Sequence, residues 1–361
     1  MISYVLPTHN RPAVLAETLA ALARLPRHDA DVIIVDNASH PPASAPPTLT
    51  NGLAVDVLRL PHNRGTAARN AGAQRAADRR GGPAGHWLVM LDDDSAPTST
   101  DFLPLLTHAH PSLAVLSAAV LLPPAPDNTT RHEAGGLPEV FIGCGAAIRA
   151  DAFLTLGGYD PSFDYYAEEY DLSARFLLAG FRVAYDRRFT VLHRKVQHGR
   201  DMDRILANLV RNNAWVMARY APPHLQSAQV QAQIDRYADI AAREGATAGY
   251  QRGLQHLQAT LAAQPRRPLP EPAWLRFTGY AAARQHLASL PGSPSVCLVE
   301  PGKHAEVVRD AARDAGLRLT DSPADADALL IASLSPGPML DAAARLRSHG
   351  RRVETPWALP G

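Results

Sequence analysis

Three consecutive carboxylates that follow an apolar run are the strongest chemical signal in the sequence. The five residues from Trp87 to Leu91 are apolar, which suits a buried strand, and Asp92, Asp93 and Asp94 come directly after them. In open α/β sheets, ligands bind at the carboxyl ends of the strands. Because adjacent carboxylates repel one another, we expect a cation at this position. Oxygen ligands favour Mg²⁺ or Mn²⁺, ions that commonly bridge to nucleotide phosphates. A solvated acidic turn is the alternative interpretation.

A sheet made of strand and helix units is needed to position these carboxylates. Apolar runs predict strands at residues 2–6, 31–35 and 54–60. Apolar residues at helical spacing predict helices after Arg11 and over residues 66–77. Successive strand and helix units that lead to an acidic strand describe an α/β fold with a mostly parallel, doubly wound sheet.

Polar residues at the ends of two of these strands suggest contacts with a nucleotide. Asp36 ends the strand at 31–35, where an acidic side chain can bind a ribose or a base edge, or close an Asx turn. Gly65 precedes the helix that carries Arg69, and a helix N-terminus with a guanidinium favours a diphosphate. Arginines on helices are also common as merely solvated side chains. These positions alone leave both interpretations open.

Four motifs follow one another in a recognisable order. They are Val5-Leu6-Pro7-Thr8-His9-Asn10-Arg11, Ile34-Val35-Asp36-Asn37-Ala38-Ser39, Asn63-Arg64-Gly65 with Ala68-Arg69-Asn70, and Leu91-Asp92-Asp93-Asp94. Together they closely resemble the family 2 glycosyltransferases of the GT-A fold, and the resemblance covers about residues 1–220. It implies that a Mn²⁺ or Mg²⁺ ion is bound by Asp92, Asp94 and His193. It implies nucleotide binding by Pro7, Thr8, Asn10, Arg11, Asp36, Asn63, Gly65, Arg69, Asp92 and Asp93.

The resemblance continues after the acidic strand. The segment from Gly143 to Arg149 is similar to the acceptor side of the family, which implies acceptor contacts by Gly143, Cys144 and Gly145. Residues 168–175 resemble its Glu-Asp helix, although the second acidic position, commonly Asp, is Glu169 here. The resemblance implies that Glu169 is the catalytic base and that Glu168 orients the acceptor or caps the helix. A helix N-terminus also favours Glu through its dipole, irrespective of catalysis.

A basic segment follows this helix. Residues 187–200 contain five Arg or Lys residues, two His residues and no acid, which indicates an anion nearby. Arg194, Lys195 and His198 are candidates for holding a donor diphosphate, a phosphorylated acceptor or an anionic lipid surface. The sequence does not separate these alternatives.

Composition limits the partners and the compartment. The chain has 361 residues and a formal net charge of +1, so no global field favours nucleic acid. Two cysteines cannot form a disulfide framework, which fits a reducing compartment. The start of the chain lacks the regions of a signal peptide, and its longest apolar run is about half of the roughly 20 residues that a membrane helix requires. We expect a cytoplasmic protein without a membrane span, with peripheral contact at the inner face of the membrane left open.

Proline-rich stretches divide the chain. We expect a catalytic domain at 1–220, a helical extension at 221–290 and a small α/β module at 291–361. The last module contains no recognisable catalytic motif. It is therefore expected to be separable and to serve partners or oligomerisation rather than chemistry.

The predicted activity is transfer of a hexosyl or deoxyhexosyl group from a nucleotide diphosphate sugar to a hydroxyl of a saccharide or lipid-linked acceptor, with inversion. Such a reaction belongs to glycan or glycolipid assembly, including polysaccharide biosynthesis. One rival is a nucleotidyltransferase on a similar fold, but its Gly-rich loop is absent after the first strand. The other rival is a protein that binds nucleotide sugar without turnover, which the Glu at position 169 leaves open.

Overall fold

The large sheet of the protein carries the predicted acidic strand at its centre. The structure, a computed structural model, describes residues 1–125, 129–195, 201–348 and 350–360. The strands of this sheet are β1 (Ile2–Thr8), β2 (Ala30–Asp36), β3 (Ala54–Arg59), β4 (Trp87–Met90), β5 (Ser95–Pro97), β6 (Leu113–Leu122), β7 (Arg131–His132), β8 (Ala146–Arg149) and β9 (Arg182–His193). Their order is β3-β2-β1-β4-β8-β6-β9-β5, and β7 pairs with β6.

The direction of the strands changes at β8. From β3 to β4 all neighbours are parallel, as predicted for the first strands. β8 is antiparallel to both β4 and β6, β6 and β9 are parallel, and β5 is antiparallel to β9. The sheet is therefore parallel on its N-terminal side and mixed on the other. The reversal at β8 places residues 143–145 beside the end of β4.

Helices with small or apolar faces cover this sheet. They are α1 (Pro12–Ala23), α2 (Ala68–Arg79), α3 (Leu103–Thr107), α4 (Ala150–Thr155) and α5 (Glu168–Leu178), with short 3₁₀ turns η1 (Gly65–Ala67) and η2 (Pro161–Phe163). Proline at the first position of α1 costs no hydrogen bond there, and the helix buries Leu15, Leu19 and Leu22 on one face. In α2, a Cβ at Gly72 would lie 2.6 Å from the Val5 side chain. Only glycine allows this close approach of helix and sheet.

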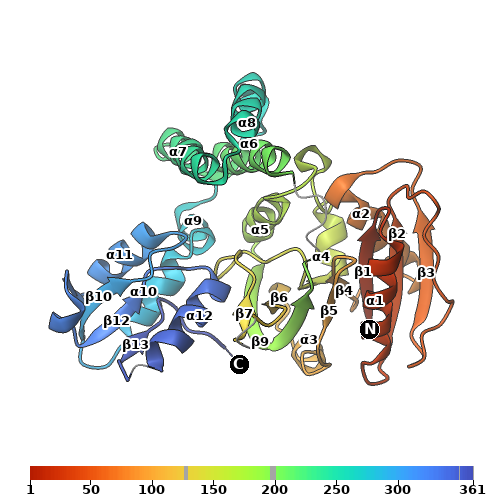
Figure 1. Ribbon diagram of the computed structural model, residues 1–361, viewed down its shortest axis with the longest axis horizontal. Coiled ribbons are helices and arrows are strands. Elements are labelled where there is room, and N and C mark those ends of the chain that lie inside the picture. Colours follow the sequence, from red (N-terminus) through yellow and green to blue (C-terminus); the bar gives the residue numbers. More distant parts are fainter. Residues whose placement is uncertain (126–128, 196–200, 349, 361) are drawn as a thin grey trace.

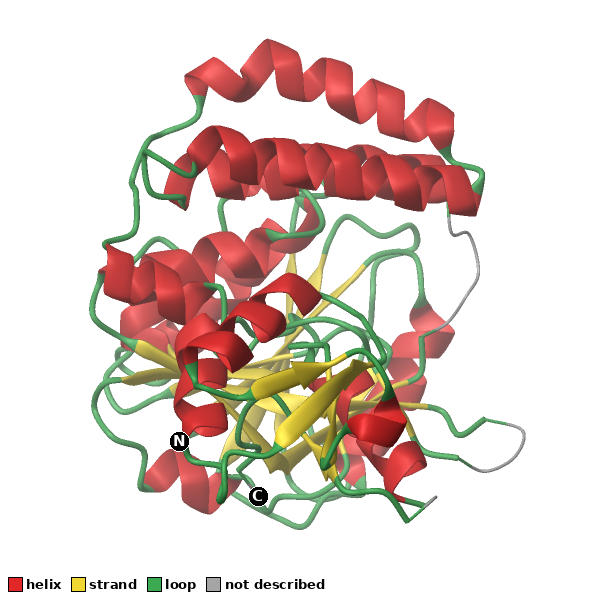
Figure 2. Cartoon of the chain, turned by 90° about the vertical axis from the view of Figure 1, so that its left-hand side faces the viewer, coloured by secondary structure: helices red, strands yellow, loops and turns green. Residues whose placement is uncertain are grey.

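A layer of long helices lies above the sheet (Figure 2). It consists of α6 (Met202–Tyr220), α7 (Gln226–Glu244) and α8 (Thr247–Thr260), followed by the turn η3 (Leu261–Ala263). Gly249 and Gly253 let α8 approach α6 closely, because a Cβ on either would lie 2.4 Å or less from a backbone oxygen of α6. Within this layer, α6 lies over the start of α5, and α8 packs against α6.

The C-terminal part forms a small parallel sheet with its own helices. Its elements are α9 (Glu271–Phe277), α10 (Tyr280–Ala288), β10 (Ser295–Val299), α11 (Ala305–Asp314), β11 (Arg318–Thr320), η4 (Pro323–Asp325), β12 (Ala328–Ile331), α12 (Pro336–Arg347) and β13 (Val353–Glu354). The strand order is β11-β10-β12-β13, with all neighbours parallel. Figure 1 shows this sheet at the end of the molecule opposite β1 to β3, with β6 and β9 between them.

The predicted fold class is confirmed. A large α/β sheet flanked by helices is followed by a helical region and a small C-terminal α/β module. Within the described residues, every helix is too short or too polar to cross a membrane. The predicted anion-binding residue His198 lies outside the described residues.

Candidate active site

The acidic turn, residues Asp92 to Asp94, lies between the end of β4 and the start of β5. The Asp92 amide donates to the Ser95 hydroxyl at 2.8 Å, and the Ser95 amide donates to the Asp92 carbonyl at 3.1 Å. These two bonds close the turn. Asp93 and Asp94 are buried, whereas about a third of the Asp92 side chain is exposed.

The last residue of β1 and a residue of the loop after it hold the buried carboxylates. Arg11 donates to Asp93 at 2.6 Å and to Asp94 at 3.0 Å, and the Thr8 hydroxyl donates to Asp93 at 2.8 Å. Burial raises the pKa of Asp93 to about 6, against the opposing effect of Arg11 and Thr8. Burial also disfavours the charged form of Asp94, but its bonds to His193 and Arg11 outweigh burial and lower its pKa. Thr8 and Arg11, which the sequence predicted near the nucleotide, thus bind the acidic turn itself.

Strand pairing places His193 beside the acidic turn. β5 and β9 pair in a register that sets Ser95 opposite His193. The His193 Nε2 lies 3.3 Å from Asp94 Oδ1 and 3.9 Å from Asp92 Oδ2. Its Nδ1 lies 3.2 Å from Glu133 Oε2. Burial alone would lower the pKa of His193, but Asp94 and its other neighbours raise it to about 12.

The chemistry of this group suits a divalent cation. Within the described residues, one ligand atom each of Asp92, Cys144 and His193 lie within 4.8 Å of one another. Burial raises the pKa of Cys144 to about 11, so it remains a thiol and a weak ligand. Asp94, which also contacts His193, supplies the oxygen that Mn²⁺ and Mg²⁺ prefer. Asp92, Asp94 and His193 therefore fit the predicted ion, and the Cys144 Sγ lies 3.5 Å from the His193 Nδ1.

Arg69 of α2 connects the acidic turn with helix α5. Its guanidinium is buried and donates to Asp92 and to the Leu91 carbonyl. Burial alone would lower the pKa of Arg69, but nearby acidic groups, including Asp92, Glu168 and Glu169, raise it. Arg69 thus bonds the acidic turn and interacts through charge with the two glutamates of α5.

The two glutamates at the start of α5 differ in environment. Glu168 is buried, and its Oε2 has no hydrogen-bond partner in the described part of the chain. Glu169 is half-buried, and its Oε1 accepts from the Gly143 amide at 3.2 Å. Burial raises the pKa of both carboxyls, and the charge of Glu169 raises that of Glu168 further. A Cβ at Gly143 would lie 2.7 Å from Glu169 Oε1, so Gly143 leaves room for this carboxylate.

A strained loop ends where α5 begins. Three of its residues have left-handed φ angles of 60°, 73° and 66°, namely Asp164, Tyr166 and Ala167. Asn212 of α6, fully buried, donates from Nδ2 to the carbonyls of Phe163, Tyr165 and Tyr166 at 2.9, 2.8 and 2.7 Å. The long helix therefore holds the loop in the conformation that presents the glutamates.

A buried ion-pair network fixes the rest of α5. Asp171 accepts from Arg219 at 2.8 Å, from the Tyr220 hydroxyl at 2.7 Å and from Arg175 at 2.8 Å. Asp171 and Arg219 are both buried, and each is paired with several polar groups. The network joins α5 to α6 and limits rotation of the helix that carries Glu169.

The other predicted nucleotide contacts form a second group around loop 37–43. Asp36 is fully buried and accepts from the amides of Ser39 and Ala43 and from Arg59, at 2.9, 3.1 and 2.8 Å. The bond to Ser39 reaches three residues along the chain, whereas an Asx turn, the alternative considered from the sequence, bonds the amide two residues on. Asp36 thus closes this loop with both of its oxygens.

Asn10 and Asn63 meet the same loop from either side. The Asn10 side chain accepts from the His40 amide at 2.7 Å. The Asn63 side chain accepts from Asn37 at 2.8 Å and from the Gly65 amide at 2.9 Å. Pro7 lies within β1, opposite Val35 of β2. These residues shape the edge of the sheet next to the acidic turn.

Several residues near the site were not predicted. Glu133 lies in the Pro-rich segment 122–138, which matches no motif, and it bonds both His193 and Lys195. The contact of Asn212 with the loop before α5 has no local sequence signal. Arg194 donates to the Val14 carbonyl and the Thr18 hydroxyl of α1. The structure thus gives both Arg194 and Lys195 partners within the protein.

Comparison with known proteins identifies the family of the N-terminal part. Residues 3–153 match the model of the family described as glycosyl transferase family 2. The match confirms the resemblance of the motifs in this segment to that family. No curated protein matches the chain.

Solved structures with some similarity are glycosyltransferases. The mannosyltransferase PcManGT from Pyrobaculum calidifontis, in complex with GDP-Man and Mn²⁺, has 18% identity and a TM-score of 0.44 over 79% of this chain and 80% of that one. GalNAc-T7 with UDP, GalNAc and Mn²⁺ has 16% identity and a TM-score of 0.48 over 73% and 57%. S. aureus TarS has 18% identity and a TM-score of 0.41 over 60% and 38%.

Proposed function

We propose that this protein is a metal-dependent, inverting glycosyltransferase that moves a hexosyl or deoxyhexosyl group from a nucleotide diphosphate sugar to an acceptor hydroxyl. The family match of residues 3–153 supports the class of reaction. The observation that carries the proposal is the position of buried Arg69, which binds Asp92 of the acidic turn and lies near Glu168 and Glu169. The guanidinium thus bonds the proposed cation site directly and interacts with the candidate base through charge at longer range.

Asp92, Asp94 and His193 are the residues that would hold a Mn²⁺ or Mg²⁺ ion. When bound, the ion would neutralise the charge of the diphosphate leaving group. Arg11 and Thr8 bond Asp93, so this carboxylate would stabilise the conformation of the acidic turn and would not bind the ion. The approach of His193 to Asp94 at 3.3 Å supports the ligand set.

Glu169 is our candidate for the base. Direct displacement with inversion needs a group that accepts the proton of the attacking hydroxyl. Glu169 is half-buried, whereas Glu168 is buried and would orient its neighbour or the acceptor. The glycine at position 143 makes space for a Glu where the family commonly has the shorter Asp. This fit supports Glu169 in the catalytic position and speaks against a protein without turnover.

The nucleoside of the donor would lie along the edge formed by Pro7, Thr8, Asn10, Arg11, Asn63 and Gly65. Asp36 would contribute by closing loop 37–43, since both of its oxygens are already bonded. A saccharide or lipid-linked acceptor would approach Glu169 past Gly143 to Gly145. We assign the reaction to cytoplasmic glycan or glycolipid assembly, with contact at the inner face of the membrane for a lipid-linked acceptor.

Release of nucleoside diphosphate tests the proposal. The protein is incubated with Mn²⁺ and a panel of uridine, thymidine and guanosine diphosphate sugars, and free nucleoside diphosphate is measured. A glycosyltransferase releases it from one donor, at a rate that an acceptor increases. Formation of pyrophosphate from a nucleoside triphosphate and a sugar phosphate would identify a nucleotidyltransferase instead. Binding without any release would identify a protein without turnover.

A further inference from the structure

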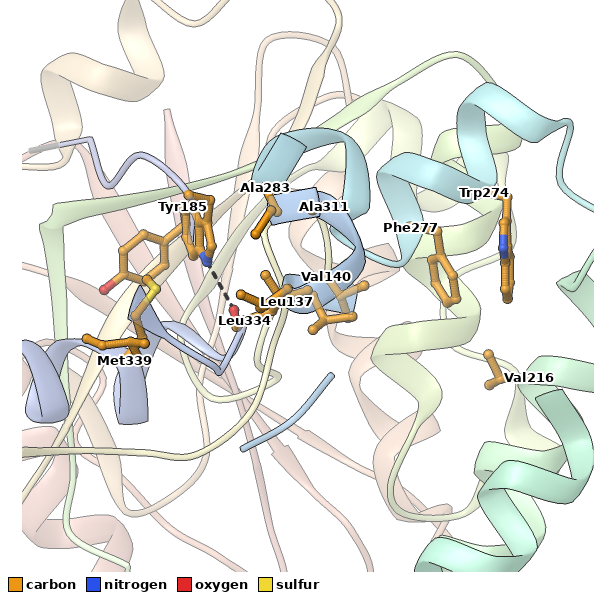
Figure 3. Close-up of a cluster of buried hydrophobic side chains, with 14 of the residues drawn as sticks. Leu137, Val140, Tyr185, Val216, Trp274, Phe277, Ala283, Ala311, Leu334 and Met339 are labelled. Atoms are coloured by element: carbon orange, nitrogen blue, oxygen red, sulfur yellow. Dashed lines mark hydrogen bonds between the residues drawn. The ribbon is translucent and has the colours of Figure 1, made fainter. Parts of the chain in front are cut away.

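The C-terminal module shares its hydrophobic core with the large sheet. Figure 3 shows Leu334 and Met339 of this module in one buried cluster with Leu137, Val140 and Tyr185. The Trp357 indole packs edge-on against Tyr185, with ring centres 5.7 Å apart. These apolar contacts attach the module to the large sheet. The polar contacts at the edge of the module join it to particular residues near His193.

Helix α12 and the residue before it are hydrogen-bonded to β7 and to the segment that follows β7. Asp341 accepts from the His132 amide at 3.0 Å and contacts the His132 Nδ1 at 2.6 Å. The Ser335 hydroxyl donates to the Gly135 carbonyl at 2.6 Å and accepts from the Gly135 amide at 3.0 Å. These contacts fix the backbone on both sides of Glu133.

Gly337 of α12 lies directly against Glu133. A Cβ at Gly337 would lie 2.2 Å from the Glu133 carbonyl oxygen, so the helix meets the backbone of this residue without a gap. The Glu133 carboxylate points the other way, to His193 Nδ1 at 3.2 Å and to the Lys195 Nζ at 2.7 Å. One residue thus connects α12 with the histidine of the proposed metal site.

We infer that the C-terminal module contributes to the proposed metal site. Helix α12 fixes the position of the segment around Glu133, and Glu133 in turn orients His193 toward the ion. The inference rests on the proposed function, because it needs His193 as a ligand. Glu133 is a positioning residue, since it contacts His193 at Nδ1, whereas Asp92 and Asp94 lie at Nε2. The module is therefore not the separable appendage expected from its lack of motifs.

The physical basis is the orientation of a ligating imidazole. A histidine that binds a metal through one ring nitrogen usually bonds a carboxylate or carbonyl through the other, which fixes the tautomer and the ring plane. Here Nε2 faces Asp92 and Asp94, and Nδ1 faces Glu133. Removing such an outer partner typically weakens metal affinity about 10- to 100-fold. A change in α12 that displaces Glu133 should therefore also weaken metal affinity, because His193 loses the same partner.

Titration of the full chain with Mn²⁺, followed by the electron paramagnetic resonance signal of the free ion, tests the inference without any substrate. Glu133→Gln should weaken Mn²⁺ binding by about 10- to 100-fold. Asp341→Ala and Gly337→Ala, both outside the site, should weaken it by about 10-fold, the lower end of that range. Asp341→Asn can still accept from the His132 amide and should largely restore the parental affinity.

Asp310→Ala is the matched control, because Asp310 is an exposed acid of the same module whose ion pair in the described part of the chain is with Arg313 of its own helix, at 3.8 Å. It should bind Mn²⁺ as the parent does. Thermal unfolding of each variant shows whether the fold is destabilised. A destabilised fold would also lower the affinity for a nucleoside diphosphate measured without metal, whereas a displaced His193 would not. Parental Mn²⁺ affinity in both Asp341→Ala and Gly337→Ala would overturn the inference. A parent protein that binds no Mn²⁺ would overturn the proposed metal site and the inference with it.

Discussion

Each carboxylate of the acidic turn is paired with a cationic side chain from a distant part of the chain. Asp92 pairs with Arg69, and Arg11 bridges Asp93 and Asp94. The turn is thus partly neutralised by the protein itself, which explains how three adjacent carboxylates persist in a mostly buried place. At the residue scale, the two glutamates of α5 are different, because no cation forms a short ion pair with either of them in the described part of the chain.

Glu169 should be required for transfer and not for donor binding. Glu169→Gln is nearly isosteric but accepts no proton, so we expect transfer to fall by roughly 10²- to 10⁴-fold. Glu168→Gln should lose less. Transfer rates and donor affinities of both variants give the answer. Parental transfer by Glu169→Gln with an inactive Glu168→Gln would shift the base to position 168, and activity in both would remove the catalytic role of this helix.

The buried Glu168 should also make stability depend on pH. Its pKa is raised in the folded protein, chiefly by burial and then by Glu169, so the fold binds this proton more tightly than the unfolded chain does. The stabilising contribution is complete below the ordinary pKa of about 4.5 and is lost as pH rises through the raised pKa. Glu168→Gln should therefore be more stable than the parent at neutral pH, with a flatter pH profile in urea unfolding. Equal profiles would contradict the raised pKa.

At the scale of elements, α5 depends on α6 for its position. The loop before α5 contains three left-handed residues, and such conformations persist only where neighbours over-determine them. Asn212 and the Asp171 network supply those constraints from α6. The helical layer therefore holds the helix that carries the proposed base, Glu169.

Asn212→Ala should loosen that loop. The change leaves buried carbonyls without a donor, which costs about 1–3 kcal/mol of unfolding free energy, and transfer should fall because the glutamates lose their fixed position. Asn51→Ala is the control, since Asn51 also donates to two backbone carbonyls, at 2.9 and 3.0 Å, at the end of α1. Urea unfolding and transfer rates compare the two. If both lose stability and transfer equally, the loop has no special role.

The elements that position the acidic turn were predictable, whereas the supports of the site were not. Apolar runs with abrupt polar ends predict β1, β2 and β4 and place the acidic turn at a strand end. The register that sets Ser95 opposite His193 arises from long-range pairing of β5 with β9, which no local pattern encodes. Glu133 and Asn212 act through contacts across 60 and 46 or more residues of sequence, so their roles appear only in the folded chain.

At the scale of the whole molecule, the small sheet and the large sheet should unfold together. Trp357 is buried between them, against Tyr185 and with its indole nitrogen donating to the Leu334 carbonyl at 3.2 Å. Trp357→Ala should cost about 3–5 kcal/mol and lower the midpoint of a single calorimetric transition. Two transitions in the parent, with only one moved by Trp357→Ala, would instead support the separable module expected from the sequence.

Binding of a nucleoside diphosphate with and without Mn²⁺, by the parent and by Asp94→Ala, tests the central claim most directly. Asp94 contributes an oxygen beside His193, so its removal should abolish the metal-dependent part of binding while the protein stays folded. His193→Ala should weaken the same binding less. Calorimetry should show that Mn²⁺ strengthens binding in the parent and has no effect in Asp94→Ala. If Asp94→Ala binds the nucleotide and Mn²⁺ as the parent does, the acidic turn is not the cation site and the proposed mechanism is wrong.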